Sequence, residues 1–334
     1  MIDTIRIYLD NKVKGVNAFI EKYYIEREPK LLKQLHITVR QTYIIIEGSI
    51  TKYVYGNNSF NPSFTDIQEA LIEIGEKLGI NIMHGKIQRI DIAHNFVMSM
   101  PVALYILEIW SSSHTNPHLY DTGIQLRNKT ITMSFYDKIM DGMKKNNVDR
   151  ATDEEINLFR YELQIKKNVS KKFGNKTIFV EQLFDSRFCQ ALVYIWFKYF
   201  MNVKAVCNVS NNSHYWINSK DISMKRCIDN LAVIGFNSLS PKEKRILLLA
   251  AKANNDRNVK SRLPNKINSL SKEYIEKVKG QDLWKEISEK VHRFYRKQME
   301  ILKNPPPLYN KVVFISKNKK TIKKNDCKNN KLYC

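Results

Sequence analysis

Cysteines are few in this sequence, and their spacing is irregular. The 334 residues include five, at Cys189, Cys207, Cys227, Cys327 and Cys334, with no Cys-x-x-Cys motif. Neither a disulfide framework nor a zinc site is therefore indicated. A reducing cytoplasm is the expected compartment.

Long apolar runs and targeting signals are also missing. The most apolar stretch, 188–197, is shorter than the roughly 20 residues that span a bilayer, and Arg187 and Lys198 flank it. The first residues, Met1 to Arg6, lack a basic segment followed by an apolar core. No Gly-x-x-x-x-Gly-Lys-Ser/Thr motif occurs. We expect no membrane association and no nucleotide cofactor.

Acidic residues are scarce relative to basic ones. Lysine and arginine together number 55 against 33 aspartates and glutamates, which gives a net charge of +22. The surplus is spread along the chain, which suits a long polyanion such as a nucleic acid better than a small anionic metabolite. The same richness in lysine, asparagine and isoleucine is also typical of AT-rich genomes, and that alternative stays open.

Strands and helices are interleaved in the first half of the chain. Alternating apolar residues, β-branched runs and short turns predict an α+β fold with a largely antiparallel sheet and helices on one face. The expected strands are 4–9, 35–55 (interrupted at Gly48-Ser49), 87–96, 119–126, 130–138 and 159–167, and the expected helices are 66–78 and 101–110.

From about residue 176 the pattern predicts helices alone. The expected helices are 178–203, 245–253 and 281–302, and lysine and asparagine dominate from Ser316 onward. We therefore expect an α+β domain over 1–175, a helical accessory domain over 176–315 and a basic disordered tail over 316–334.

Three of the expected strands each separate a polar from an apolar face. Side chains alternate between the two faces of an extended strand. If the strands share a sheet whose apolar face is covered by helices, their polar side chains converge on one open surface. The polar sets are Thr130, Thr132, Ser134, Tyr136 and Lys138 on one strand, Arg89 and Asp91 on the second, and Arg160, Glu162 and Gln164 on the third.

Tyr136 and Lys138 are candidates for nucleophilic chemistry. A tyrosine hydroxyl has a reference pKa of about 10 and is a poor nucleophile at neutral pH. The ammonium of Lys138, two residues along the same face, would favour the phenolate or stabilise charge on a phosphate under attack. A purely structural role for this pair is the alternative.

Asp91 and Glu162 are candidate metal ligands. Carboxylates are the hard oxygen donors that Mg²⁺ or Mn²⁺ accepts, and such an ion could polarise a phosphodiester. The alternative is that each carboxylate pairs with the arginine of its own strand, Arg89 or Arg160.

Short motifs along the first 200 residues occur in the order seen in the gene II/gene X replication initiators of filamentous phages, and the chain resembles that family. The motifs are Met1-Ile-Asp3, Gly48-Ser-Ile-Thr-Lys52 followed by Gly56-Asn-Asn58, Arg89-Ile-Asp91, Phe135-Tyr-Asp-Lys138, and Phe159-Arg-Tyr-Glu162 running into Lys171-Lys-Phe-Gly174.

The resemblance implies an HUH-type (Rep-like) rolling-circle initiator in a bacterial host cytoplasm. Such an enzyme nicks one strand of double-stranded origin DNA, from a phage or a plasmid, keeps the 5′ end as a phosphotyrosine, and rejoins the displaced single strand. It works beside a host helicase and polymerase. The two-histidine signature of most HUH enzymes is absent here.

Carried over residue by residue, the resemblance assigns Tyr136 as the nucleophile with Lys138 beside it. Asp91 and Glu162 become the ligands of Mg²⁺ or Mn²⁺. The expected DNA contacts are Lys52, Asn58, Arg89, Arg160, Lys166 and Lys167.

Two other functions compete with this interpretation. A non-catalytic replication or transcription factor would explain the charge and the helices, but not three polar strand faces. An RNA-binding protein would explain the charge and the aromatic residues, but no Lys/Arg-Gly-Phe/Tyr strand signature is present.

Overall fold

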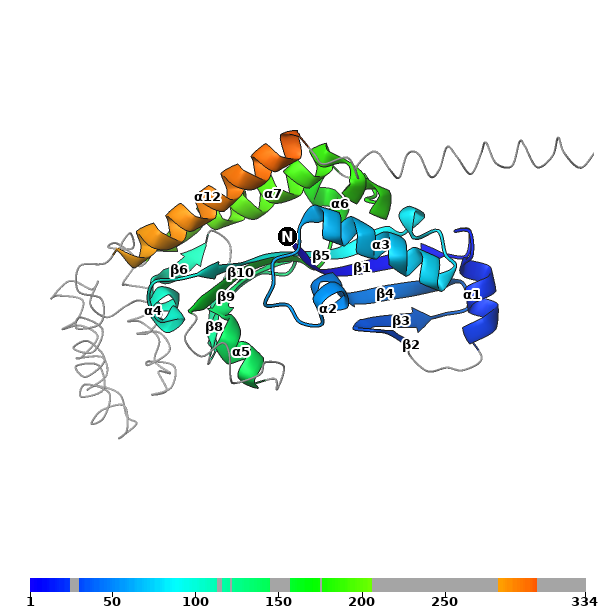
Figure 1. Ribbon diagram of the computed structural model, residues 1–334, viewed down its shortest axis with the longest axis horizontal. Coiled ribbons are helices and arrows are strands. Elements are labelled where there is room, and N and C mark those ends of the chain that lie inside the picture. Colours follow the sequence, from blue (N-terminus) through cyan, green and yellow to red (C-terminus); the bar gives the residue numbers. More distant parts are fainter. Residues whose placement is uncertain are drawn as a thin grey trace, which may run out of the picture.

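The structure is a computed structural model that describes residues 1–24, 30–112, 116–120, 122–144, 157–174, 176–205 and 282–304. Its centre is a nine-stranded sheet in the order β2-β3-β4-β1-β5-β10-β9-β8-β7, with antiparallel neighbours throughout (Figure 1). The predicted α+β class and antiparallel pairing are confirmed. The strands are β1 (Ile2–Asp10), β2 (Lys30–Leu32), β3 (Leu35–Val39), β4 (Tyr43–Ser49), β5 (Lys86–Val97), β7 (Asn116–Tyr120), β8 (Gly123–Arg127), β9 (Ile131–Asp137) and β10 (Leu158–Ile165).

The remaining elements are helices and one small additional sheet. Strands β6 (Ile109–Ser112) and β11 (Val203–Ala205) pair with each other. The helices are α1 (Val16–Tyr23), α2 (Ile50–Tyr55), α3 (Phe64–Leu78), α4 (Val102–Leu107), α5 (Lys138–Lys144), α6 (Val169–Lys172), α7 (Ser186–Met201) and α12 (Leu283–Lys303), with 3₁₀ turns η1 (Ile82–His84) and η2 (Val180–Phe184).

Two elements differ from the sequence-based expectation. Residues 50–55, expected to extend a strand, form α2, because the Ser49 side chain accepts a hydrogen bond from the Lys52 amide and caps a helix. Gly56 ends α2 with φ of 78°, a conformation that favours glycine. The helix expected over 101–110 ends at Leu107, and β6 follows it.

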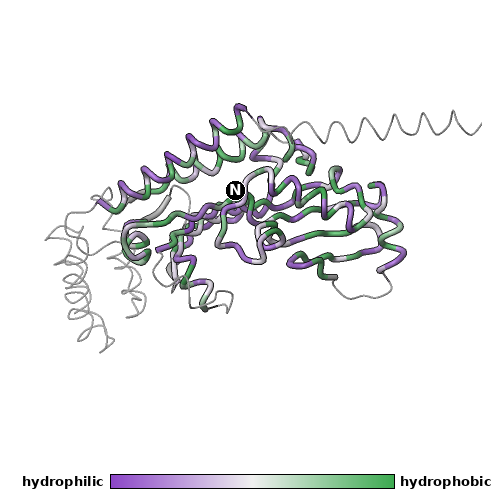
Figure 2. The backbone as a smooth tube through the Cα atoms, in the orientation of Figure 1, coloured by the Kyte–Doolittle hydropathy of each residue, from purple (hydrophilic) through white to green (hydrophobic). Residues whose placement is uncertain are grey.

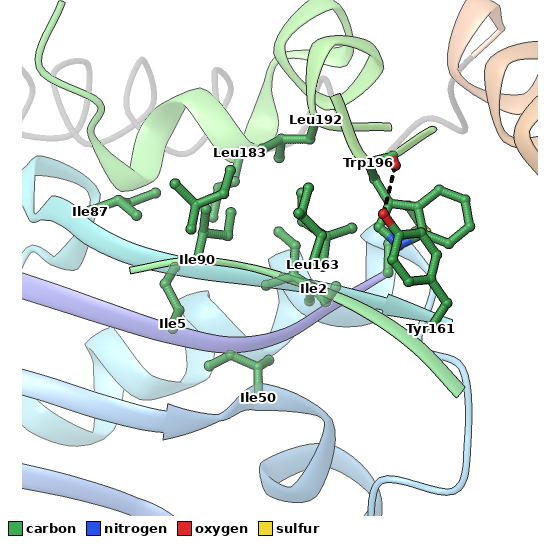
Figure 3. Close-up of a cluster of buried hydrophobic side chains, with 14 of the residues drawn as sticks. Ile2, Ile5, Ile50, Ile87, Ile90, Tyr161, Leu163, Leu183, Leu192 and Trp196 are labelled. Carbon is green, nitrogen blue, oxygen red and sulfur yellow. Dashed lines mark hydrogen bonds between the residues drawn. The ribbon is translucent and has the colours of Figure 1, made fainter. Parts of the chain in front are cut away.

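The apolar face of the sheet is covered by α7 and α12, which lie side by side above β5 and β10 (Figure 1). Trp196 of α7 is fully buried, and its carbonyl accepts a 3.0 Å hydrogen bond from the Tyr161 hydroxyl of β10 (Figure 3). Phe294 of α12 stacks on His94 of β5 with ring centroids 3.6 Å apart. In α12 the hydrophilic residues lie on the outer side (Figure 2). This layer is one continuous hydrophobic core with the sheet.

A polar contact fixes α12 to the segment after β5. The Glu286 carboxylate accepts hydrogen bonds from the Ser99 hydroxyl (2.6 Å), the Ser99 amide (3.0 Å) and the Tyr105 hydroxyl (2.5 Å). These bonds lower the pKa of Glu286 to about 2, against the opposing effect of burial. Parts of the predicted helical region thus pack directly on the sheet.

The predicted division at residue 175 stays a prediction, because 206–281 lie outside the described residues, as does the predicted tail 316–334. In the described ranges, no helix has the length and apolar character needed to cross a bilayer.

The opposite face of the sheet is partly covered by α5 and by the segment after α2. Both contribute residues to a pocket beside Tyr136, and α5 lies on the side away from α7 and α12 (Figure 1). Helices therefore flank both faces, where one was expected.

Candidate functional site

Strand register places the predicted polar residues in neighbouring rows. Across β9, β10 and β5, Tyr136 lies opposite Arg160, and Arg160 lies opposite Asn95. Four residues along β10, Gln164 lies between Thr132 and Asp91. Because side chains directly opposite one another point to the same face, the three strands bring their polar sets together as expected.

The polar face was expected to be open, but in the structure it is buried. Asp91, Arg160 and Glu162 are 1%, 1% and 6% exposed. At Arg160 the physical reason is that the segment after α2 covers this end of the sheet. There the Asn95 side chain donates to the carbonyls of Asn58 (3.3 Å) and Ser59 (2.8 Å).

Arg160 is the central charge of this buried cluster. Its guanidinium forms an ion pair with Asp3 (Nη2 to Oδ2, 3.0 Å) and another with Glu162 (Nε to Oε2, 3.4 Å). Nη1 donates to the Asn95 Oδ1 (3.0 Å) and to the Asn58 carbonyl (3.2 Å). Burial disfavours its charge, but Tyr136 and these carboxylates raise its pKa overall. In this arrangement Arg160 positions other groups and has no free surface for DNA.

Asp3 joins the site although the alternation of β1 does not predict it. Ile2 pairs with Ile92 and Thr4 with Asp91, so β1 carries one extra residue at Asp3. Such a bulge re-aims a side chain. The Asp3 carboxylate accepts from Ser49 Oγ (3.0 Å). Burial would raise its pKa, but Arg160 and Ser49 lower it.

Asn95 could have been found from the sequence, because it has the same strand parity as Arg89 and Asp91 in β5. Asp3 could not have been found by parity. Its only sequence signal was its place in the first motif of the resemblance.

Tyr136 is 8% exposed, and its hydroxyl donates a 3.2 Å hydrogen bond to Glu162 Oε2. Burial raises the pKa of Tyr136 well above its ordinary value; Arg160 opposes this rise and Glu162 adds to it. The resting phenol is therefore protonated. Glu162 is therefore the group placed to accept that proton.

Lys138 begins α5, and its ammonium donates to Asn58 Oδ1 at 2.6 Å. Burial, with Arg160 adding to it, lowers the pKa of Lys138 to about 8. Arg160 is the cation that lowers the pKa of Tyr136 most, against the larger effect of burial; the role expected of Lys138 stays a prediction.

Four of the predicted residues, Lys52, Asn58, Tyr136 and Lys138, line one pocket with a volume of about 130 Å³. They come from α2, the segment after it, β9 and α5. Two lysines, an amide and a phenol thus face the same small space, together with the carboxylate of Asp141. The two ammonium groups are the ones that could contact a phosphate group there.

Asp91 and Glu162 each pair with the arginine of their own strand. Arg89 donates to Asp91 through Nε (3.0 Å) and Nη2 (2.6 Å). Burial is the main reason that the pKa of Asp91 rises to about 7, with Glu162 adding to the rise and Arg89 opposing it. Glu162 Oε1 accepts from the Gln164 amide at 2.7 Å. The ion-pair alternative describes this resting state.

The donor set limits what metal the site could hold. The described residues contain no group of three or more His, Cys, Asp or Glu side chains placed to bind one ion. Mg²⁺ is commonly held by one or two carboxylates together with waters and substrate phosphates. Asp91 and Glu162 fit that kind of site, because they supply two carboxylates from neighbouring strands, with Glu162 opposite Ala93 and therefore diagonal to Asp91.

Three other predicted residues lie away from the pocket or are engaged. Lys166 and Lys167 are exposed after the end of β10, about 20 Å along the strand from Arg160 at roughly 3.4 Å per residue. Arg89 is partly exposed, and its Nη1 lies 3.5 Å from Glu47. Two other tyrosines, Tyr120 and Tyr161, are the alternative nucleophiles to Tyr136. Tyr161 is fully buried on the helix-covered face, whereas Tyr120 lies opposite Gly123, which in turn lies opposite Tyr136.

No protein-family model matches this chain, and the curated proteins contain no match either.

Proposed function

We propose that the protein is a rolling-circle replication initiator, a site-specific single-strand DNA endonuclease and strand transferase with an HUH/Rep-like fold. The main support for this proposal is that one pocket is lined by residues from separate segments, namely Tyr136, Lys138, Lys52 and Asn58. The phage or plasmid origin, double-stranded and then single-stranded, is the substrate.

In the proposed reaction the Tyr136 oxygen attacks a backbone phosphorus and the bond to the 3′ oxygen breaks. The phenolic proton passes to Glu162, which already accepts its hydrogen bond. The leaving 3′ oxygen takes a proton from Lys138, whose pKa of about 8 suits donation near neutral pH. The 5′ phosphate stays on Tyr136, so rejoining by the reverse steps needs no ATP.

Charge development on the phosphate is met by the cations of the pocket. Lys52 and Lys138 line it directly, and Arg160 lies behind Tyr136. Groups fixed before the reaction stabilise such charge without reorganising. Mg²⁺ or Mn²⁺ would be held by Asp91 and Glu162 and would supply Lewis-acid polarisation of the phosphate when bound.

The decisive test is covalent labelling. Wild type incubated with Mg²⁺ and a single strand spanning the origin, labelled at its 3′ end or internally on the 3′ side of the nick, should form a denaturant-resistant adduct that maps to Tyr136. Tyr136→Phe removes one oxygen and keeps the ring, so DNA affinity should change little while the adduct disappears.

Tyr120→Phe is the matched control, and it should retain the adduct. An adduct that persists in Tyr136→Phe and disappears in Tyr120→Phe would move the nucleophile to Tyr120. Cleavage without an adduct in any of the three proteins would replace the phosphotyrosine mechanism with attack by water.

One observation favours a second candidate, a non-catalytic origin-binding factor. Both carboxylates of the site are neutralised by arginines at rest, which is an arrangement that a structural ion-pair network also shows. That candidate predicts origin binding with no cleavage at any Mg²⁺ or Mn²⁺ concentration.

A further inference from the structure

Two aromatic side chains are exposed beside the pocket. Phe60 is 57% exposed and Tyr55 is 39% exposed. Their ring centroids lie 5.5 Å apart with the planes tilted by 44°. Residues 56–59, which connect the two aromatic residues, all line the pocket together with Lys52 and Lys138. An apolar surface of two rings therefore adjoins a pocket whose charged lining residues are Lys52, Lys138 and Asp141.

The aromatic pair is held in place from both sides. The Tyr55 hydroxyl donates to Asp66 Oδ2 at 2.8 Å, and Asp66 belongs to the capping box that begins α3. The connecting segment is bonded to β5 through the Asn95 side chain. Because these contacts exist without a ligand, little ordering is required when one binds.

We infer that Tyr55 and Phe60 form a stacking platform for a base of single-stranded nucleic acid, next to the phosphate that occupies the pocket. Every base has a π-face, so stacking tolerates any sequence. Lys52 and Lys138 supply the charge complementarity, since a nucleotide joins an apolar base to an anionic phosphate. The inference rests on the proposed function only for the class of ligand, single-stranded nucleic acid.

The test is direct binding of a hexathymidylate at moderate salt in EDTA, where no metal-dependent cleavage occurs. Phe60→Ala should bind it about 5- to 150-fold more weakly, the range that loss of one base–aromatic stack gives. Both proteins should bind a hexanucleotide of abasic sugar phosphates equally. Tyr194→Ala, which removes a 49%-exposed aromatic side chain from α7, is the control and should bind like wild type.

Phe60→Trp provides a second readout that does not depend on affinity. Its indole fluorescence should be quenched by hexathymidylate and unaffected by the abasic strand. Equal affinity of Phe60→Ala and wild type for hexathymidylate would overturn the inference and leave the aromatic surface to a protein partner. An equal loss for both strands would also overturn it, because the effect would then be electrostatic or structural.

Failure here and failure of the proposed function are separable. The platform can be refuted while wild type still forms the Tyr136 adduct. Conversely, a protein with no adduct but with base-dependent binding at Phe60 would keep the platform and lose the nicking activity.

Discussion

Replacing Arg160 with glutamine should destabilise the protein more than any exposed charge substitution. The guanidinium is 1% exposed and forms ion pairs with Asp3 and Glu162. Breaking a buried ion pair by removing one partner costs about 3–5 kcal/mol, because the remaining charge stays buried without compensation. Arg6→Gln is the matched control. Its ion pair with Glu47 is 40% and 34% exposed, and such pairs contribute about 0–1 kcal/mol.

The pH dependence of that loss identifies its cause. In wild type the pKa of Asp3 lies below 3.8, so the stability it contributes is present at neutral pH and is lost only in acid. Without Arg160, burial raises the pKa of Asp3 instead. The folded variant then binds a proton that the unfolded chain does not, so the gap to wild type should narrow as the pH falls from 7 to 5.

Urea denaturation at pH 7 and pH 5, followed by circular dichroism, measures the loss of stability and its pH dependence. The free energies of unfolding can be compared if their dependence on urea concentration has the same slope in each protein. Adding Asp3→Asn to Arg160→Gln should recover part of the lost stability at pH 7, because it removes the uncompensated carboxylate. The reasoning is refuted if Arg160→Gln costs no more than Arg6→Gln, or if the gap is the same at both pH values.

Three further predictions address the site and its support. Asp91 has a pKa of about 7 and must lose its proton to bind a metal, so Mn²⁺ should raise the melting temperature more at pH 8 than at pH 6. In Asp91→Asn the rise should be the same at both pH values. An equal rise at both pH values in wild type would contradict this prediction. In the metal-free protein the same shift means that stability falls as the pH rises from 3.8 to about 7, since only the folded state keeps that proton. Gly123→Ala should lower both the melting temperature and the adduct yield, because the added Cβ would overlap the Tyr136 Cβ and the Phe135 carbonyl. Such overpacking costs about 1–3 kcal/mol. Unchanged adduct formation would show that the reaction does not depend on the packing of Gly123 against Tyr136. Glu286→Gln should be less stable than wild type at pH 7, and the difference should vanish as the pH falls from 4.5 towards 2; a constant difference would mean that charge is not the cause.

Local pattern alone predicted the two faces of β5, β9 and β10. Alternation is a property of the extended backbone itself, so Tyr136, Arg160 and Asp91 fall on the polar side of any sheet these strands build. A helix over 66–78 was also predicted from local pattern, and α3 spans Phe64–Leu78, with a capping box of Ser63 and Asp66 at its start and Gly79 at its end with φ of 65°. Such features depend on residues a few positions apart, so they can be predicted without knowing which distant segment packs against them.

Strand order, bulges and burial were decided by contacts between distant segments. The position of β10 between β5 and β9 sets Arg160 against Asn95 and Tyr136, and no local rule specifies that order. The bulge at Asp3 arises from pairing with β5. Asn58 reaches Lys138 and Arg160 only because α2 formed where a strand was expected. The polar face was predicted to be open because alternation tells which side a residue occupies and says nothing about what later covers it.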